Sequence, residues 1–87
     1  MAHPPLPLSR LDERTWRLDC IGMLCPVPVI KTGRAVREVP IGSTLEILAD
    51  DPGAELDLQD WCSANRHEFL QQSSDGDVWT TRIRRTR

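Results

Sequence analysis

The chain has few of the residues that build metal centres, disulfide frameworks or membrane spans. Its 87 residues include three cysteines and two histidines, and no two cysteines form a Cys-x-x-Cys pair. This scarcity argues against a structural zinc site, and the odd number of cysteines argues against a disulfide framework. We recognise no signal peptide, so we expect free thiols in a reducing cytoplasm. The apolar runs are too short to cross a bilayer, and we expect no membrane role.

The chain also has no large excess of charge of either sign. Eleven Lys and Arg residues face thirteen Asp and Glu residues, for a formal net charge of -2. This balance argues against general affinity for nucleic acids. The basic carboxyl end is the exception, since its arginines invite an RNA-binding interpretation. In an acidic chain they are weak support for direct nucleic-acid binding. These arginines are Arg82, Arg84, Arg85 and Arg87.

The length allows one small domain, with a core just large enough to fold alone. Pro4, Pro5 and Pro7 predict a flexible, proline-rich leader over residues 1–13. We therefore expect a single domain over residues 14–87.

The spacing of apolar residues predicts the element order β-α-β-α-β-β. Alternation of apolar and polar side chains indicates strands, and apolar stripes at intervals of three and four residues indicate helices. The predicted strands cover 15–20, 43–49, 69–73 and 78–84, and the helices cover 26–38 and a short segment capped by Asp57. This order predicts a two-layer α/β sandwich, in which both helices cover one face of a four-stranded mixed sheet. The first crossover is expected to be right-handed.

The tetrapeptide Cys25-Pro26-Val27-Pro28 places a thiol at the start of the first predicted helix. Proline is well tolerated in a first helical turn, so Pro26 marks the helix start. A sulfur at that point feels the positive end of the helix dipole, which favours the thiolate. Since Pro26 and Pro28 lack an N–H, only Val27 and Val29 can donate to an anion, and we expect a shallow cradle for one small anion. The competing interpretation is that Cys25 is a small buried apolar residue.

The residues around this tetrapeptide resemble a known family. Segment 18–28, with the sequence LDCIGMLCPVP, resembles the amino-terminal signature of the TusA/SirA-like sulfur carriers, and the motif cysteine falls on Cys25. The resemblance extends from about residue 16 to residue 84. Further positions with family-like spacing are Asp50-Asp51-Pro52, Asp57, Cys62 and His67-Glu68-Phe69. Arg66 departs from the family pattern, since many relatives have glycine there to ease the turn after the second helix.

The resemblance implies a sulfurtransferase that relays sulfur between proteins and acts together with partner enzymes. Cys25 would hold sulfane sulfur as a persulfide or thiosulfonate, without a cofactor or a metal. The implied partners are a cysteine desulfurase or rhodanese-type donor and a downstream sulfur-accepting protein of the DsrE/TusD-like kind. Relatives serve tRNA thiolation, molybdoenzyme maturation or sulfur oxidation, and no residue of this chain selects among these pathways.

Other polar residues could assist Cys25, each with a simpler interpretation beside it. Cys62 could relay sulfur and Cys20 could form a regulatory disulfide, but both fit core positions better. His67 could tune the thiolate, although an isolated histidine is more often a surface or turn residue. Asp19 and Asp50 fit turn caps at strand ends.

Lys31, Arg34 and Arg37 form a basic face of the first predicted helix near the thiol. This face could dock an acidic donor enzyme, or it could be an ordinary solvated surface.

Two other functions compete with the sulfur carrier. In the first, the chain is a non-catalytic RNA- or protein-binding regulatory module, and Cys25-Pro26-Val27-Pro28 only shapes a helix start. Serine at position 25 would then leave activity intact, while charge reversal at Arg82 and Arg84 would abolish it. The second, a thiol-disulfide oxidoreductase, is disfavoured because Pro28 stands where a Cys-x-x-Cys motif has its second cysteine.

Overall fold

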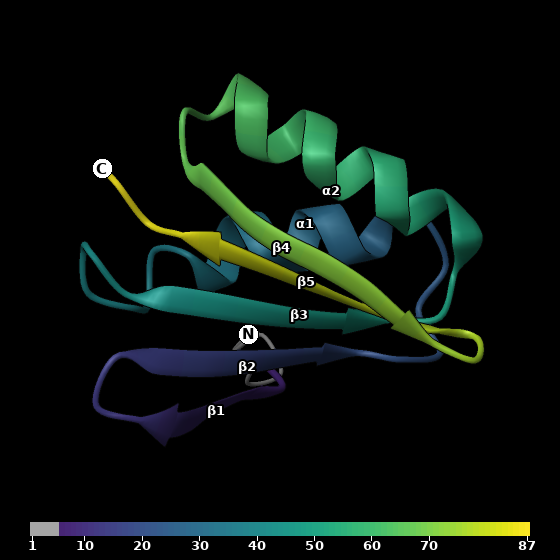
Figure 1. Ribbon diagram of the computed structural model, residues 1–87, viewed down its shortest axis with the longest axis horizontal. Coiled ribbons are helices and arrows are strands. Elements are labelled where there is room, and N and C mark those ends of the chain that lie inside the picture. The colour runs from purple at the N-terminus through teal and green to yellow at the C-terminus, as the bar shows by residue number, and fades with distance from the viewer. Residues whose placement is uncertain (1–5) are drawn as a thin grey trace, which may run out of the picture.

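The computed structural model describes residues 6–87 as one five-stranded sheet with two helices packed on one of its faces (Figure 1). The strands are β1 (Leu8–Asp12), β2 (Thr15–Cys20), β3 (Thr44–Ala49), β4 (Glu68–Asp75) and β5 (Val78–Arg84). The helices are α1 (Val27–Ala35) and α2 (Pro52–Ala64). The strand order across the sheet is β1-β2-β3-β5-β4. Only β2 and β3 pair in parallel, so the sheet is mixed as predicted.

Strand alternation separates an apolar face of the sheet from a polar one. On the helix side, Leu18, Ile47 and Ile83 are fully buried, and Leu58 of α2 packs against them. Burying side chains of this size supplies the main drive for folding, about 1.5–3 kcal/mol for each. The predicted two-layer α/β sandwich is therefore confirmed, and so are the strands before and after the Gly76 turn.

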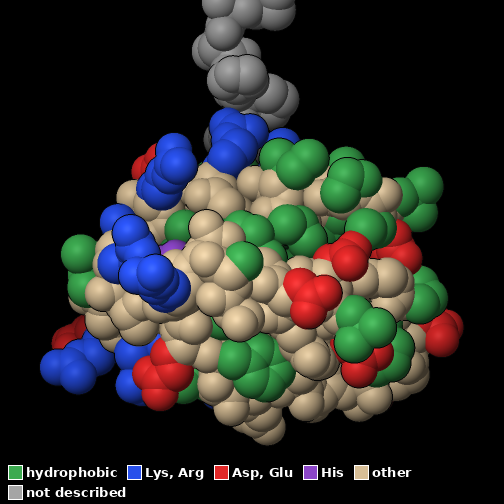
Figure 2. Space-filling view, turned by 90° about the horizontal axis from the view of Figure 1, so that it is seen from above, with side chains coloured by type: hydrophobic (Ala, Val, Ile, Leu, Met, Phe, Trp, Pro, Cys, Tyr) green, Lys and Arg blue, Asp and Glu red, His purple; other side chains and the backbone are tan. Residues whose placement is uncertain are grey.

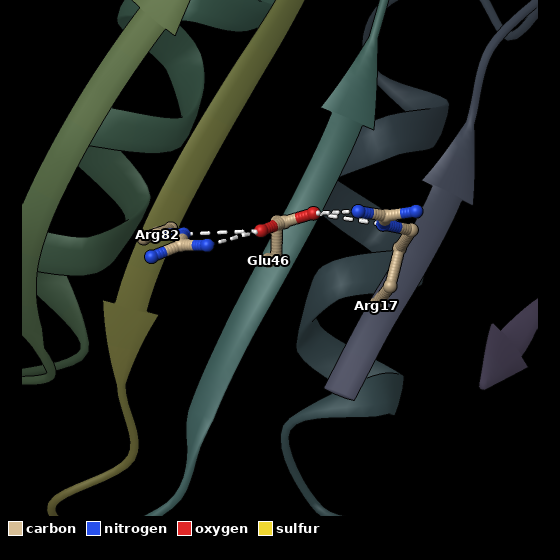
Figure 3. A network of polar contacts seen from close by, with 3 residues as sticks. All are labelled: Arg17, Glu46 and Arg82. Atoms are coloured by element: carbon tan, nitrogen blue, oxygen red, sulfur yellow. Dashed lines mark hydrogen bonds and ion pairs between the residues drawn. The ribbon is translucent and has the colours of Figure 1, made fainter. Parts of the chain in front are cut away.

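On the opposite, open face of the sheet, Glu46 lies between Arg17 and Arg82 (Figure 3). Its carboxylate accepts from Arg17 at 2.7 Å and from Arg82 at 2.9 Å, and its side chain is 4% exposed. Burial alone would raise the pKa of Glu46, but the two arginine hydrogen bonds hold it below its usual value. Arg84 is paired with Glu68 at 3.0 Å. Two of the four arginines behind the RNA-binding interpretation, Arg82 and Arg84, thus have carboxylate partners.

Strand β1 corrects the predicted leader and the predicted strand count. Residues 1–5 of the leader lie outside the described residues, but Leu8–Asp12 pairs with β2 as an antiparallel edge strand. Leu8 packs against the core, and the Arg10 guanidinium lies 5.3 Å from the centroid of the Trp16 ring. These contacts hold the short segment on the sheet, although the prolines that precede it suggested a poorly ordered leader.

Both helices begin or end at different residues from those predicted. Helix α1 ends at Ala35 rather than near 38, and residues 36–38 continue the chain as a turn. Helix α2 begins at Pro52, because the Asp51 side chain accepts the Gly53 N–H at 3.0 Å as its N-cap. Asp57, the predicted N-cap, lies instead inside α2. The Asp-Pro-Gly sequence that indicated a turn is equally suited to a helix start, since proline fits the first helical position.

Arg66 occupies the left-handed conformation after α2, with φ 60°. The His67 N–H donates to Cys62 O at 3.1 Å and the Arg66 N–H donates to Ser63 O at 3.2 Å. This pair of bonds is the Schellman arrangement that glycine usually closes. The chain therefore makes this turn with an arginine at the position where glycine is usual.

Within residues 6–87, neither helix is long and apolar enough to span a bilayer.

Candidate functional site

Cys25 lies in the loop between β2 and α1, directly before the N-cap residue Pro26. Because β2 and β3 are parallel, their carboxyl ends reach the same edge of the sheet, where α1 and α2 both begin (Figure 1). The thiol is thus close to the amino ends of two helices, which carry partial positive charge. All three cysteines lie within residues 6–87, and only Cys25 is exposed.

Two carboxylates from the start of α2 contact Cys25. Asp51 accepts the Cys25 N–H at 2.5 Å while it also caps α2 through Gly53. Asp57 accepts a hydrogen bond from the Cys25 thiol. Its place one and a half turns into α2 brings its carboxylate back toward the loop that holds Cys25. The backbone and the side chain of Cys25 are therefore each held by a separate aspartate.

These contacts change the expected ionisation of the thiol. The pKa of Cys25 is raised above its usual value, first because the thiol donates to Asp57, then through desolvation and the negative charges of Asp57 and Asp51. Hydrogen bonds from Cys25 and Gly53 lower the pKa of Asp51, so its carboxylate stays charged beside the thiol. The sequence predicted a thiolate stabilised by the helix dipole, whereas the contact with Asp57 favours the protonated thiol. Local spacing does not indicate that Asp57 faces the sulfur.

The predicted anion cradle has fewer free N–H donors than expected. The Val27 N–H donates to Leu24 O at 2.9 Å, so one of its two expected donors is already occupied. The prolines nevertheless lie where they were predicted to shape the helix start, with Pro26 as N-cap and Pro28 buried in the first turn.

Exposed apolar side chains lie on the β2–α1 loop, on α1 and on the first turns of α2. They include Leu24, which is 74% exposed, and Leu56, which is 65% exposed. Ile21, Val27 and Ile30 are exposed as well. Figure 2 shows hydrophobic and acidic side chains gathered toward the right side of the helical face. Exposed apolar residues that lie close together mark protein contact surfaces more often than solvated ones.

A shallow groove of about 360 Å³ lies between the helices beside this site. Pro26 and Val29 of the α1 side and Asp57 and Trp61 of the α2 side line it. The groove therefore begins next to Cys25 and runs along the contact between the two helices.

Small and acidic residues position the loops around Cys25. A Cβ added at Gly53 would lie 3.6 Å from Cys25 Cβ and 3.9 Å from its sulfur, so Gly53 forms the surface directly behind the thiol. Asp50 accepts the Gly22 N–H at 2.9 Å and ties the β2–α1 loop to the end of β3. Asp19 accepts the Ile21 N–H at 3.0 Å, as expected for a turn cap. The roles of Asp51 and Gly53 were missed, because their sequence pattern indicated only a turn.

Cys20 and Cys62 are buried in the core. Burial, followed by the charge of Asp19, raises the pKa of Cys20 to about 11. Burial also raises the pKa of Cys62, whose sulfur donates to His67 O at 3.2 Å. Since the thiolate is the reactive form, both environments favour packing over chemistry.

The remaining candidates lie away from the thiol. His67 follows the carboxyl end of α2 and stacks on Trp61, with ring centroids 5.5 Å apart. Arg34 lies in the last turn of α1 and Arg37 follows it, so the basic face points to the far end of the helical layer rather than to Cys25. Lys31 lies between the two ends and is half-buried. Among residues 6–87, no three His, Cys, Asp or Glu side chains are grouped to hold a metal ion.

Comparison with known proteins returns sulfur carriers. The profile of the family described as Sulfurtransferase TusA matches residues 17–85. The chain is 39% identical over 61 residues to "Putative sulfur carrier protein YrkI" of Bacillus subtilis (strain 168), which covers 70% of this chain and 81% of that protein. It is 36% identical over 61 residues to "Putative sulfur carrier protein YrkF" of the same strain, and there it spans only 33% of the longer relative.

A solved structure shares the fold. The crystal structure of a SirA-like protein from Desulfitobacterium hafniense superposes with a TM-score of 0.66 and 26% sequence identity, over 82% of this chain and 97% of that one. The family profile begins within β2, so β1 lies outside the matched region.

Proposed function

Because the chain belongs to the TusA family of sulfur carriers, we propose that Cys25 is the residue that holds the sulfur and passes it from one protein to another. The observation that carries this proposal is the contrast among the three thiols. Cys20 and Cys62 are buried, whereas Cys25 is exposed at the edge of the sheet where both helices begin. Access is the first requirement for exchange between proteins.

The proposed loading step is a thiol exchange that needs no oxidant. The Cys25 sulfur attacks the outer sulfur of a persulfide on the donor protein. A new sulfur–sulfur bond forms to Cys25, the old one breaks, and the donor sulfur leaves as a thiolate that takes up the proton lost by Cys25. The products are a Cys25 persulfide and a donor thiol, and the same exchange in the other direction unloads the carrier.

The surroundings of Cys25 suit both states of the sulfur. In the empty carrier, Asp57 accepts a hydrogen bond from the protonated Cys25 thiol and holds the thiol in place. In the loaded carrier, the terminal sulfur is a more acidic group, so it faces the helix amino ends as an anion. The carboxylates of Asp51 and Asp57 repel that anion, which favours an outward position where a partner can reach it.

The proposed partners are proteins. A cysteine desulfurase or rhodanese-type protein would load Cys25, and a DsrE/TusD-like protein would accept the sulfur from it. The exposed apolar residues Leu24, Ile30 and Leu56 supply a surface suited to such contacts. The proposed location is a reducing cytoplasm, where Cys25 would stay available as a free thiol.

The test is a relay assay with labelled sulfur. Purified protein is incubated with a cysteine desulfurase and [35S]cysteine, or with labelled thiosulfate, and the protein-bound label is measured before and after addition of reductant. We expect reductant-labile label in the natural protein and in Cys62→Ser, and none in Cys25→Ser. Label that persists in Cys25→Ser, or that is absent from the natural protein with every donor, would contradict the proposal and favour a non-catalytic binding module.

A further inference from the structure

A second concave region lies at the far end of the helical layer from Cys25. A cavity of about 550 Å³ opens there between the carboxyl ends of α1 and α2 and the end of the chain. Four arginines line it, Arg34 and Arg37 from the α1 side and Arg85 and Arg87 from the carboxyl end, together with Trp61 and His67. Figure 2 shows basic side chains gathered toward the left of the helical face, with a histidine beside them.

The charge of this pocket is not balanced by nearby side chains. Among the described residues, none of the side chains that line it carries a carboxylate, and the main-chain carboxyl group of Arg87 already accepts a hydrogen bond from Arg85. The arginine–carboxylate pairs found in residues 6–87 involve Arg17, Arg82 and Arg84, and none of these lines the pocket. The carboxyl ends of the two helices contribute partial negative charge, and the main-chain carboxyl group of Arg87 contributes at most one charge more. The four guanidinium groups exceed this sum.

Several of the donors are held in place. Arg85 donates to Val39 O at 2.6 Å and to Arg87 O at 2.9 Å, which fixes its guanidinium and leaves further N–H groups to donate. His67 Nδ1 accepts the Thr86 N–H at 3.2 Å, so the neutral ring carries its proton on Nε2. The Trp61 indole Nε1 lies beside Gly33, which also lines the pocket. The pocket thus presents preorganised donors.

We propose that this pocket binds a phosphate-bearing ligand of about nucleotide size. Guanidinium groups reach it from two separate segments, and a tetrahedral dianion can accept hydrogen bonds from several directions where a planar carboxylate accepts mainly in its plane. Its volume falls within the range of small-molecule sites, about 300–1,000 Å³, and exceeds what one phosphate group fills. The stacked Trp61 and His67 rings give the remainder of the ligand an aromatic surface.

His67 reports the potential inside the pocket. Burial lowers its pKa first, and the positive charges of Arg85 and Arg87 lower it further. A bound anion would offset those charges and stabilise the imidazolium, so it would raise the pKa of His67. The histidine therefore provides a readout that does not depend on sulfur transfer.

The pocket also adjoins the groove that begins beside Cys25. Trp61, Ala64 and Asn65 line both. A ligand bound by the arginines would contact these shared residues, which continue toward the thiol. Its binding does not require Cys25 to carry sulfur.

The test is a titration of the full chain with pyrophosphate and, separately, with ADP, followed by NMR of the His67 ring and the Trp61 indole. The comparison variants are the double substitution Arg34→Gln and Arg37→Gln, and the single substitution Arg84→Gln on the open face of the sheet. We expect both signals to shift with saturation and the pKa of His67 to rise. Affinity is expected to fall about tenfold or more in the double variant, as for lost charge-assisted hydrogen bonds, and to stay almost unchanged in Arg84→Gln.

Equal affinity for pyrophosphate and ADP would identify the phosphate group itself as the ligand chemistry, and tighter ADP binding would identify a nucleotide. The proposal is overturned if neither probe moves the two signals of the natural protein, if Arg84→Gln weakens binding as much as the double variant, or if citrate binds as tightly as pyrophosphate. The titration of the natural protein decides the question even if the double variant fails to fold.

Discussion

The two ends of the helical layer carry opposite chemistry. At the Cys25 end, Asp51 and Asp57 surround an exposed thiol, and at the other end Arg34 and Arg37 line a pocket. The difference follows from topology, because the parallel pairing of β2 and β3 makes both helices begin at one edge of the sheet and end at the other. Carboxylates complement helix amino ends and arginines complement carboxyl ends. A reactive group at either end therefore meets the helix ends together with the charged side chains that gather there.

At the Cys25 end, two influences on the thiol oppose each other. The helix amino ends favour an anionic sulfur, whereas the hydrogen bond to Asp57 favours the protonated thiol. The pKa of Cys25 is raised, which is the direction that the hydrogen bond to Asp57 favours. Four substitutions, two at each end of the helical layer, test this comparison.

The largest effect is expected for Asp57→Asn. Removing the charge that holds the thiol proton lowers the pKa of Cys25, so the pH profile of its alkylation by iodoacetamide moves to lower pH. Each unit of displacement raises the thiolate fraction tenfold at pH values below the pKa, and we expect a several-fold faster reaction near neutral pH. The buried thiols contribute little to this rate.

Asp60→Asn is the matched control for Asp57→Asn, because Asp60 lies on the same helix and lines the groove. The structure shows no contact between Asp60 and the Cys25 thiol among residues 6–87. An equal acceleration in Asp60→Asn, or no change in Asp57→Asn, would contradict a specific contact between Asp57 and the thiol.

Asp51→Ala tests the same end through stability. It removes the N-cap of α2, which costs about 1 kcal/mol of unfolding free energy, and urea denaturation should show it. Asp51→Asn keeps an oxygen that can cap the helix, so we expect it to retain most of the stability while it still removes the charge beside Cys25. Equal destabilisation by both substitutions would show that charge, rather than capping, is the contribution of Asp51.

Arg66→Gly tests the opposite end. A side chain in the left-handed conformation costs about 1–2 kcal/mol, and the extra freedom of glycine in the unfolded chain offsets about 0.4–1 kcal/mol of that. We expect a net gain of about 0.5–1 kcal/mol in thermal unfolding, with no gain for Arg66→Ala, which keeps a Cβ. Loss of stability in Arg66→Gly would mean that the arginine side chain makes a contribution larger than the strain of its backbone.

The smallest effect is expected for Arg87→Gln, which removes one positive charge near His67. The pKa of His67 should rise, because the neighbouring guanidinium groups disfavour the imidazolium. NMR titration of the ring measures it, with Arg84→Gln as the control of equal charge change. A rise of the same size in the control would indicate a general effect of net charge.

The strands that alternate strictly were predictable from sequence, and so was the position of the thiol at a helix start. The first strand, β1, was not, because prolines precede it and most of its residues are exposed. It is stabilised by pairing with β2, where Leu8 lies beside Leu18 and Arg10 beside Trp16. Local spacing therefore identified the layers but not the sheet edge.

The chemistry around Cys25 was predictable only in part. Local sequence places the thiol beside one helix dipole, and it says nothing of Asp57, which is 32 residues away and reaches the sulfur only through the packing of α1 beside α2. Arg34 and Arg37 were predicted near the thiol because they lie on the same helix. They lie instead at its carboxyl end, and the length of the helix separates them from Cys25. Ionisation at a site depends on charges brought in by tertiary structure, so sequence pattern alone misjudged its direction.

The most direct measurement is peptide mass spectrometry after loading the protein with a cysteine desulfurase and cysteine. It assigns the added sulfur to one of three thiols that share a chain but differ in exposure. We predict one additional, reductant-labile sulfur atom on the peptide that contains Cys25, and unmodified peptides for Cys20 and Cys62. Added sulfur on Cys20 or Cys62, with the Cys25 peptide unmodified, would contradict the account of Cys25 as the carrier residue.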